Sequence, residues 1–132
     1  MVGMSSEVKE LFTNVKPIAM ATCSSENIPN VAYMTSQVAI SNTEIVVVDN
    51  YMKKTKKNIE ETGKASLLVY DEKSRKSYQL LCSAVIKESG ELFDKHTKIH
   101  RERGRPGKAI VLLHIKAVYN QTPGDDAGTK MV

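Results

Sequence analysis

The sequence contains no tryptophan, and phenylalanine and tyrosine together supply only 5% of its 132 residues. Its formal net charge is +4 and its pI is about 9.0, so the chain is only mildly basic. Modules that bind single-stranded nucleic acid combine a basic groove with aromatic side chains on which bases stack. The shortage of aromatic residues argues against nucleic acid as a partner. Two basic segments, 53–57 and 101–108, keep a cofactor-free nucleic-acid module as an alternative.

No apolar run approaches the roughly 20 residues that a helix needs to cross a bilayer. The N-terminal stretch MVGMSSEVKELF has no basic segment followed by an apolar one, so it does not resemble a secretory signal. Two cysteines, Cys23 and Cys82, lie far apart in apolar surroundings and form no metal or redox motif. We therefore expect a cytoplasmic protein without a membrane segment, with two buried, reduced thiols.

The sequence also lacks the common catalytic motifs, since it has no GxSxG, no Walker loop and no HExxH. His96 and His100 lie four residues apart on a predicted helix, a spacing that could hold a metal ion. No carboxylate or cysteine accompanies them, so two partly exposed imidazoles on one helical face are the simpler interpretation. We expect no metal site, and the sequence assigns no catalytic residue.

The length and composition are typical of one domain over residues 1–132, with a polar tail at 122–132. The hydrophobic periodicity predicts helices at 5–15, 53–63 and 90–104 and strands at 18–24, 31–40, 45–49, 65–71, 78–88 and 108–121. Most of these strands follow one another through short turns without crossover helices. This order favours a mainly β fold with flanking helices, a six-stranded antiparallel barrel, over a doubly wound parallel sheet.

The segment YMKKTKKNIEE, residues 51–61, combines a cluster of lysines with the start of a helix. A buried strand is predicted to end at Asp49, and the helix to begin near Lys54. Unpaired N–H groups at a helix N-terminus attract anions, whereas lysines there oppose the helix dipole. Lys53, Lys54 and Thr55 can therefore form a phosphate seat. On local physics alone, a solvated basic helix face is the simpler interpretation.

Four features, in this order, resemble the FMN-binding split-barrel family related to pyridoxamine 5'-phosphate oxidase, in its small single-domain form. They are a helix and the hairpin PIAMATCSSENIPNVAYMT, the strand and basic helix start IVVVDNYMKKTKKNI, the strand pair ASLLVYDEKSRKSYQLLCSAVI, and the last strand with its tail KAIVLLHIKAVYNQTPGDDAG. The resemblance extends from about Glu7 to Gly128. The order and spacing of these features carry it, rather than any single motif.

The resemblance implies a homodimeric split barrel that holds FMN in a cleft between two chains. It places Lys54 and Thr55 on the FMN phosphate, with Lys53 as their neighbour. The flavin ring and the ribityl chain would follow the second and third strands. The matching positions are Tyr33, Met34, Thr35, Ser36, Val48, Asp49 and Asn50, and Gln79 is a further position that would reach the flavin or its phosphate. The tail 122–132 would cover the partner's cleft or extend into solvent.

The resemblance also limits the expected activity. The chain is shorter than the vitamin B6 oxidases and carries only part of their arginine-rich phosphate set and of their substrate-phosphate set, which speaks against pyridoxamine-phosphate oxidase activity. We expect an FMN-binding flavoprotein that acts as an oxidoreductase or an electron carrier. Because relatives of this fold use a deazaflavin coenzyme or bind haem, these two are the alternative cofactors.

Overall fold

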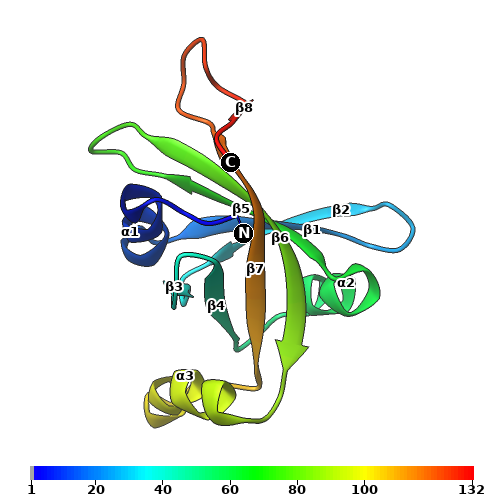
Figure 1. The fold of residues 1–132 in the computed structure, drawn as a ribbon. Coiled ribbons are helices and arrows are strands. Elements are labelled where there is room, and N and C mark those ends of the chain that lie inside the picture. Colours follow the sequence, from blue (N-terminus) through cyan, green and yellow to red (C-terminus); the bar gives the residue numbers. More distant parts are fainter. Residues whose placement is uncertain (1) are drawn as a thin grey trace.

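Eight antiparallel strands form one curved sheet, and three helices pack against it (Figure 1). We describe residues 2–132 of the protein from a computed structural model. The helices are α1 (Ser6–Asn14), α2 (Lys54–Thr62) and α3 (Glu91–Glu102). The strands are β1 (Ile18–Cys23), β2 (Pro29–Met34), β3 (Val38–Ala39), β4 (Glu44–Asp49), β5 (Lys64–Tyr70), β6 (Ser77–Lys87), β7 (Ala109–Asn120) and β8 (Thr129–Lys130). The predicted mainly β fold with flanking helices is confirmed.

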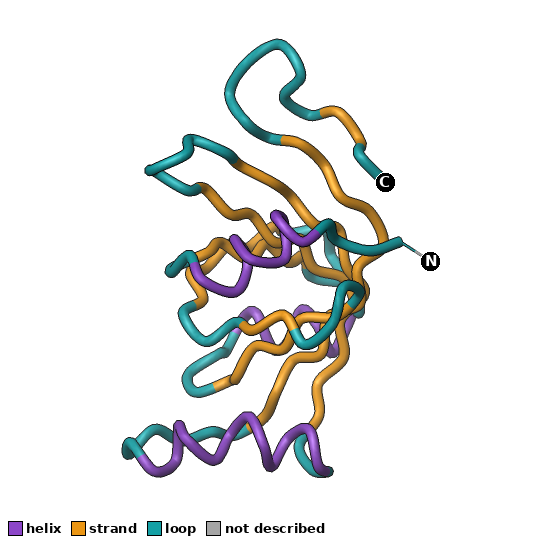
Figure 2. The backbone as a smooth tube through the Cα atoms, turned by 60° about the vertical axis from the view of Figure 1, so that its left-hand side comes forward, coloured by secondary structure: helices purple, strands orange, loops and turns teal. Residues whose placement is uncertain are grey.

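The sheet curves strongly but does not close on itself (Figure 2). Its strand order is β2-β1-β5-β6-β7-β4-β3, with β8 beside β7. β2 and β3 therefore lie at opposite ends of the order, and the barrel is split between them. The predicted antiparallel split barrel is confirmed, although the structure has eight strands where six were expected. The two additional strands, β3 and β8, have two residues each.

The predicted strand 31–40 is wrong in its middle, where the chain leaves the sheet ladder. Ser36 turns its hydroxyl group to the main chain of Val48, accepting from Val48 N at 2.9 Å and donating to Val48 O at 3.2 Å. Gln37 is fully buried, and its Nε2 donates to the carbonyl of Val15 at 2.5 Å. Side-chain hydrogen bonds thus replace ladder bonds here, which interrupts the strand.

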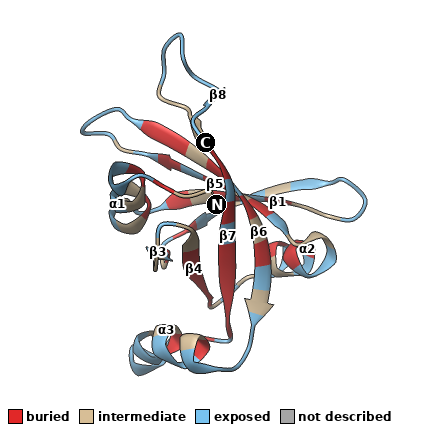
Figure 3. Cartoon of the chain, viewed as in Figure 1, coloured by how far each residue is buried: buried red, intermediate tan, exposed pale blue. Residues whose placement is uncertain are grey.

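β4 is buried on both of its faces (Figure 3). Ile45 and Val47 point into the main core, which also holds side chains of α1 and α2. Val46 and Val48 point to the other side and pack with Phe93 of α3. This two-sided burial explains why the sequence of β4 is continuously apolar, whereas a strand with one solvated face would alternate.

α3 meets the sheet through a face that overlaps the apolar stripe of its sequence only in part. At helical spacing Leu92, Phe93, His96 and Ile99 form that stripe. In the structure Phe93 and Thr97 are buried and Leu92 is partly buried, whereas Ile99 is 49% exposed. The guanidinium of Arg101 lies 5.0 Å from the centre of the Phe93 ring. The contact face therefore follows positions four residues apart, and the stacked arginine covers the ring in place of an apolar side chain.

The tail folds back on its own chain. Thr129 and Lys130 of β8 pair with Asn120 and Tyr119 of β7, and Met131 N donates to Val118 O at 2.7 Å.

Among residues 2–132, no helix is both long enough and apolar enough to cross a membrane.

We predict that the two cysteines differ strongly in reactivity. Both thiols are free, but Cys82 is buried, and its burial raises the pKa of the thiol to about 12. Cys23 is only half-buried, which corrects the expectation of two buried thiols. Because the thiolate is the reactive form, brief alkylation of the native protein should modify Cys23 alone, and denaturant should expose Cys82. Intact-mass measurement checks this, and rapid labelling of the native Cys23→Ser variant would contradict it.

Candidate functional site

A cleft of about 400 Å³ lies at the split of the barrel, where the end of β2 approaches the end of β4. One wall is formed by the segment 50–53, which follows β4, and by the first turn of α2. The other wall is formed by the end of α3 and the turn after it. The lining residues are Ala32, Tyr33, Met34, Thr35, Ser36, Val48, Asn50, Tyr51, Met52, Lys53, Thr55, His100 and Arg105. No carboxylate lines the cleft within the described part of the chain.

The segment after β4 is held in place by two side chains. Asp49 is fully buried, and its Oδ1 accepts from Met52 N at 2.8 Å, which shapes the turn before α2. Asn50 bridges to the other wall, because its Oδ1 accepts from Gly107 N at 2.9 Å and its Nδ2 lies 3.1 Å from His100 Nδ1. These bonds fix His100 and the turn after α3 against the end of β4.

The start of α2 presents unpaired N–H groups without a side-chain cap. Lys53 occupies the cap position and makes no capping bond, and the first turn has no acidic residue. In contrast, Ser5 caps α1 by accepting from Val8 N at 3.3 Å. Unpaired N–H groups carry partial positive charge, which the cations Lys53 and Arg105 in the same cleft reinforce. An anion would neutralise all of these groups together.

Thr55 is buried at the base of this wall. Its Oγ1 accepts from Asn30 Nδ2 at 3.2 Å, so its own proton is free to donate. Thr22 accepts from Asn58 Nδ2 at 3.0 Å, which ties the next turn of α2 to β1. The β1–β2 hairpin therefore holds the first turn of α2 in a fixed position.

The cleft brings together most of the residues that the sequence proposed. These are Tyr33, Met34, Thr35, Ser36, Val48, Asn50, Lys53 and Thr55. Asp49 lies behind the cleft wall, and Lys54 lines a separate cavity of about 250 Å³ with Lys57 and Glu61. Gln79 lies on the outer face of the sheet, where its Nε2 donates to Ser66 Oγ at 2.9 Å and its Oε1 accepts from Gln121 at 3.0 Å.

Five lining residues were not identified from the sequence, namely Ala32, Tyr51, Met52, His100 and Arg105. The first three adjoin predicted positions along the chain, whereas His100 and Arg105 do not. His100 and Arg105 follow Thr55 by 45 and 50 residues, and no local motif links the two regions. The basic run KIHRERGRPGK was the one signal available, and its charge alone does not indicate which residues face a ligand. Burial, together with the positive charges of Arg105 and Arg103, lowers the pKa of His100.

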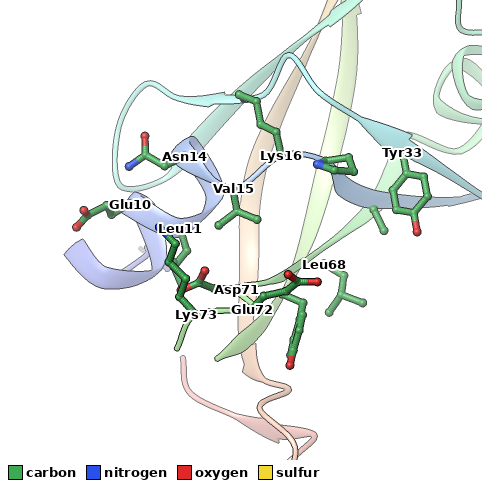
Figure 4. A pocket seen from close by; sticks show the side chains of 13 residues that line it. Glu10, Leu11, Asn14, Val15, Lys16, Tyr33, Leu68, Asp71, Glu72 and Lys73 are labelled. Carbon is green, nitrogen blue, oxygen red and sulfur yellow. The ribbon is translucent and has the colours of Figure 1, made fainter. Parts of the chain in front are cut away.

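A larger cavity of about 900 Å³ lies between α1 and the turn that joins β5 to β6, and Tyr33 lines both this cavity and the cleft (Figure 4). Its walls carry Glu10, Asp71 and Glu72 beside Lys16 and Lys73. The three carboxylates repel a phosphate, so the cavity suits an anion less well than the cleft does. Within residues 2–132, no cluster of histidine, cysteine, aspartate and glutamate is arranged to hold a metal ion.

Several known proteins are similar to this chain. An uncharacterized protein of Methanocaldococcus jannaschii is 32% identical over 127 residues, which cover 92% of this chain and 82% of that protein. HupZ from Group A Streptococcus, whose crystal structure is solved, has 24% sequence identity to this chain. The structural match covers 97% of this chain and 100% of the HupZ chain, with a TM-score of 0.83. An FMN-binding protein from Syntrophomonas wolfei is 19% identical, covers 86% of each chain, and has a TM-score of 0.74.

Proteins of this fold differ in the cofactor they are named for. Beside the FMN-binding protein, the solved structures include an F420 reductase, with 12% identity, a TM-score of 0.66, and coverage of 83% of this chain and 94% of its own. They also include HutZ, a haem storage protein of Vibrio cholerae. It has 16% sequence identity and a TM-score of 0.67, and the match covers 90% of this chain and 95% of the HutZ chain. At these identities the likeness shows a shared fold and does not select a cofactor.

The family itself is shown by the sequence match. The profile of the family described as pyridoxamine 5'-phosphate oxidase matches residues 4–122, which include every element from α1 to β7 and the whole cleft. The chain therefore belongs to the pyridoxamine 5'-phosphate oxidase family, with the split-barrel fold that the resemblance implied.

Proposed function

We propose that the protein is a homodimeric, FMN-binding flavoprotein that acts as an oxidoreductase or an electron carrier. The observation that carries the proposal is the uncapped start of α2, which opens into a cleft with Lys53 and Arg105 and without a carboxylate. This donor set fits a phosphate monoester. The bound flavin would supply the redox chemistry, and the chain would supply binding, orientation and charge.

The phosphate end of FMN would lie at the start of α2. Lys53 and the free N–H groups of the first turn would contact the phosphate oxygens, and the buried Thr55 hydroxyl would donate to one of them. Arg105 would approach from the opposite wall. Lys54 faces the neighbouring cavity, so we expect it to act on the phosphate mainly through its charge at longer range.

The ring end would run along β2. This strand pairs with β1 on one side only, so its other edge has free main-chain donors and acceptors. Val48 of β4 has no such free main-chain groups in the cleft, because the Ser36 hydroxyl is bonded to both its N–H and its C=O. We therefore infer that residues 33–35 supply the main-chain contacts to the flavin, and that Val48 supplies an apolar surface.

A second copy of the chain would cover the outer face of β2, β1, β5 and β6. The strand register builds two rows across this face, which are Tyr33–Ala19–Leu68–Gln79 and Val31–Ala21–Ser66–Leu81. Tyr33 is 76% exposed, Val31 68% and Leu68 42%. The small alanines leave a hollow of about 410 Å³ among these larger side chains. An exposed apolar face with such projections and hollows is typical of a protein–protein interface. In a twofold dimer, this face of one subunit would pack against the same face of the other subunit.

The dimer would also give Gln79 a role. In one chain it lies outside the cleft, on the face that the partner would cover. Tyr33 lines the cleft and also belongs to this face, so the cleft and the proposed interface are adjacent. We propose that the flavin lies where the two meet, with Gln79 reaching it from the second subunit.

We predict that Lys53→Ala and Thr55→Ala each weaken FMN binding by roughly tenfold or more, because each removes a hydrogen bond to a charged acceptor. Quenching of flavin fluorescence during titration measures the affinity. Lys57→Ala is the matched control, since Lys57 is an exposed lysine of α2 that lies outside the cleft. Lys54→Ala should have a smaller effect than Lys53→Ala. A purified protein that is colourless and takes up no FMN would refute the proposed function.

We predict that Leu68→Lys shifts the protein from dimer to monomer, because it places a charge at the centre of the proposed interface. Sedimentation velocity measures the change in mass. Ile99→Lys is the control, because Ile99 is exposed to a similar degree on α3, away from this face. If the unaltered protein sediments as a monomer at micromolar concentration, or if both variants behave alike, the outer face is not the dimer interface.

A further inference from the structure

We propose that His100 is a neutral hydrogen-bond donor, held in one tautomer by Asn50, that binds an oxygen of the anion in the cleft. The same constraint prevents His100 from acting as an axial ligand to haem iron. The inference rests on the proposed function for the identity of the anion. It adds a binding residue to the cleft and a reason why this site discriminates against haem coordination.

The first step is the orientation of the Asn50 amide. Gly107 N lies 2.9 Å from Asn50 Oδ1, and a backbone N–H can only donate, so the atom facing it must be the oxygen. Gly107 is itself fixed in place. Its φ is +51°, a Cβ there would lie 3.0 Å from Arg101 Cγ, and its carbonyl accepts from Arg101 at 2.8 Å. The Asn50 amide therefore has one orientation, with Nδ2 toward His100.

The second step is the proton on the His100 ring. Nδ2 of an amide only donates, so His100 Nδ1, at 3.1 Å, must accept and carries no hydrogen. In a neutral imidazole the hydrogen is then on Nε2. Because the ring lines the cleft, Nε2–H is the polar group that His100 has left to offer a ligand.

The third step is the charge of the ring. The charged residues that line the cleft with it are Lys53 and Arg105, and Arg103 lies on the turn after α3. The nearby carboxyl of Asp49 is buried behind the cleft wall, where it accepts from Met52 N. Burial and the positive charges of Arg105 and Arg103 lower the pKa of His100. No negative group of the described cleft offsets them, so the ring is neutral at neutral pH.

The fourth step is the kind of ligand this suits. A neutral N–H donor beside Arg105 matches a phosphate oxygen, which accepts several hydrogen bonds at once. A histidine that binds a metal presents a bare nitrogen to it and donates its other N–H to a partner. His100 has the opposite arrangement, because Asn50 occupies the bare nitrogen. Coordination through Nε2 would break the bond to Asn50 and leave its amide facing an N–H group.

The first test needs no ligand. Long-range ¹H–¹⁵N spectra of the free protein at neutral pH distinguish the two tautomers, and the His100 signals are assigned from their loss in His100→Gln. We expect hydrogen on Nε2. In Asn50→Asp, a carboxylate oxygen can accept from Nδ1–H, so the Nδ1 nitrogen should become protonated. An Nδ1–H tautomer in the unaltered protein, or no change in Asn50→Asp, would overturn the proposal.

The second test is the affinity for FMN against riboflavin, which lacks the phosphate. His100→Ala should weaken FMN binding roughly tenfold and leave riboflavin binding unchanged, and His100→Gln, which retains a donor, should recover most of the loss. The control is His114→Ala, because His114 lies on β7 beside Glu44, outside the cleft. Unchanged FMN affinity in His100→Ala, or an equal loss for both ligands, would contradict the assignment.

The third test uses ferric haem. The Soret spectrum after haem addition should be the same for the unaltered protein and for His100→Ala, whereas Asn50→Asp should gain a His100-dependent Soret shift. A shift in the unaltered protein that disappears in His100→Ala identifies His100 as an iron ligand and overturns the proposal. If the unaltered protein binds no FMN, the proposed function fails, but the tautomer and haem tests still decide the state of His100.

Discussion

The two-sided burial of β4 is the constraint on which the site depends. Ile45 and Val47 anchor the strand in the main core, and Val46 and Val48 hold α3 on the opposite side. Because both faces are covered, the strand cannot slide or tilt without exposing one of them. Its end at Asp49 is therefore fixed, and so are the turn that leads into α2 and the end of α3 that carries His100. The cleft forms where these fixed ends meet the free edge of β2.

The charge in the cleft supports the proposal that it binds an anion. Lysine at a helix start opposes the helix dipole, and arginine beside it adds further repulsion. A structure without a ligand there would be more stable with a serine or aspartate cap, as α1 has with Ser5. The cations of the cleft thus lower the stability of the empty chain and are offset only when an anion binds. This mismatch between local stability and sequence is typical of a functional site.

The sequence was sufficient to predict the order of the helices and of the longer strands, because these depend on local patterns. The proposed phosphate seat at 53–55 came from the family resemblance, since local physics alone favoured a solvated helix face. The apolar run of β4, the helix that follows it and Gly63, which ends α2 in a left-handed conformation, can each be read from neighbouring residues. His100 and Arg105 could not be predicted, because they reach the cleft only through the packing of Phe93 on β4 and β7. The sequence also could not show which of the two lysines faces the cleft. Successive residues at a helix start point in directions about 100° apart, so Lys53 lines the cleft and Lys54 lines a separate cavity.

The uneven covering of the sheet connects the site to assembly. α3 shields the outer face of β4 and β7, whereas the outer face of β1, β2, β5 and β6 is left bare with Val31, Tyr33 and Leu68 exposed. Aromatic residues make up only 5% of the chain, and one of its five tyrosines, Tyr33, lies at the border between that bare face and the cleft. If the bare face is covered by a second copy, that step also narrows the mouth of the cleft and excludes water from the ligand. Hydrogen bonds and charges in the cleft, including the donor of His100, are strengthened when water is removed. Assembly and ligand binding would then be favoured by the same burial of surface.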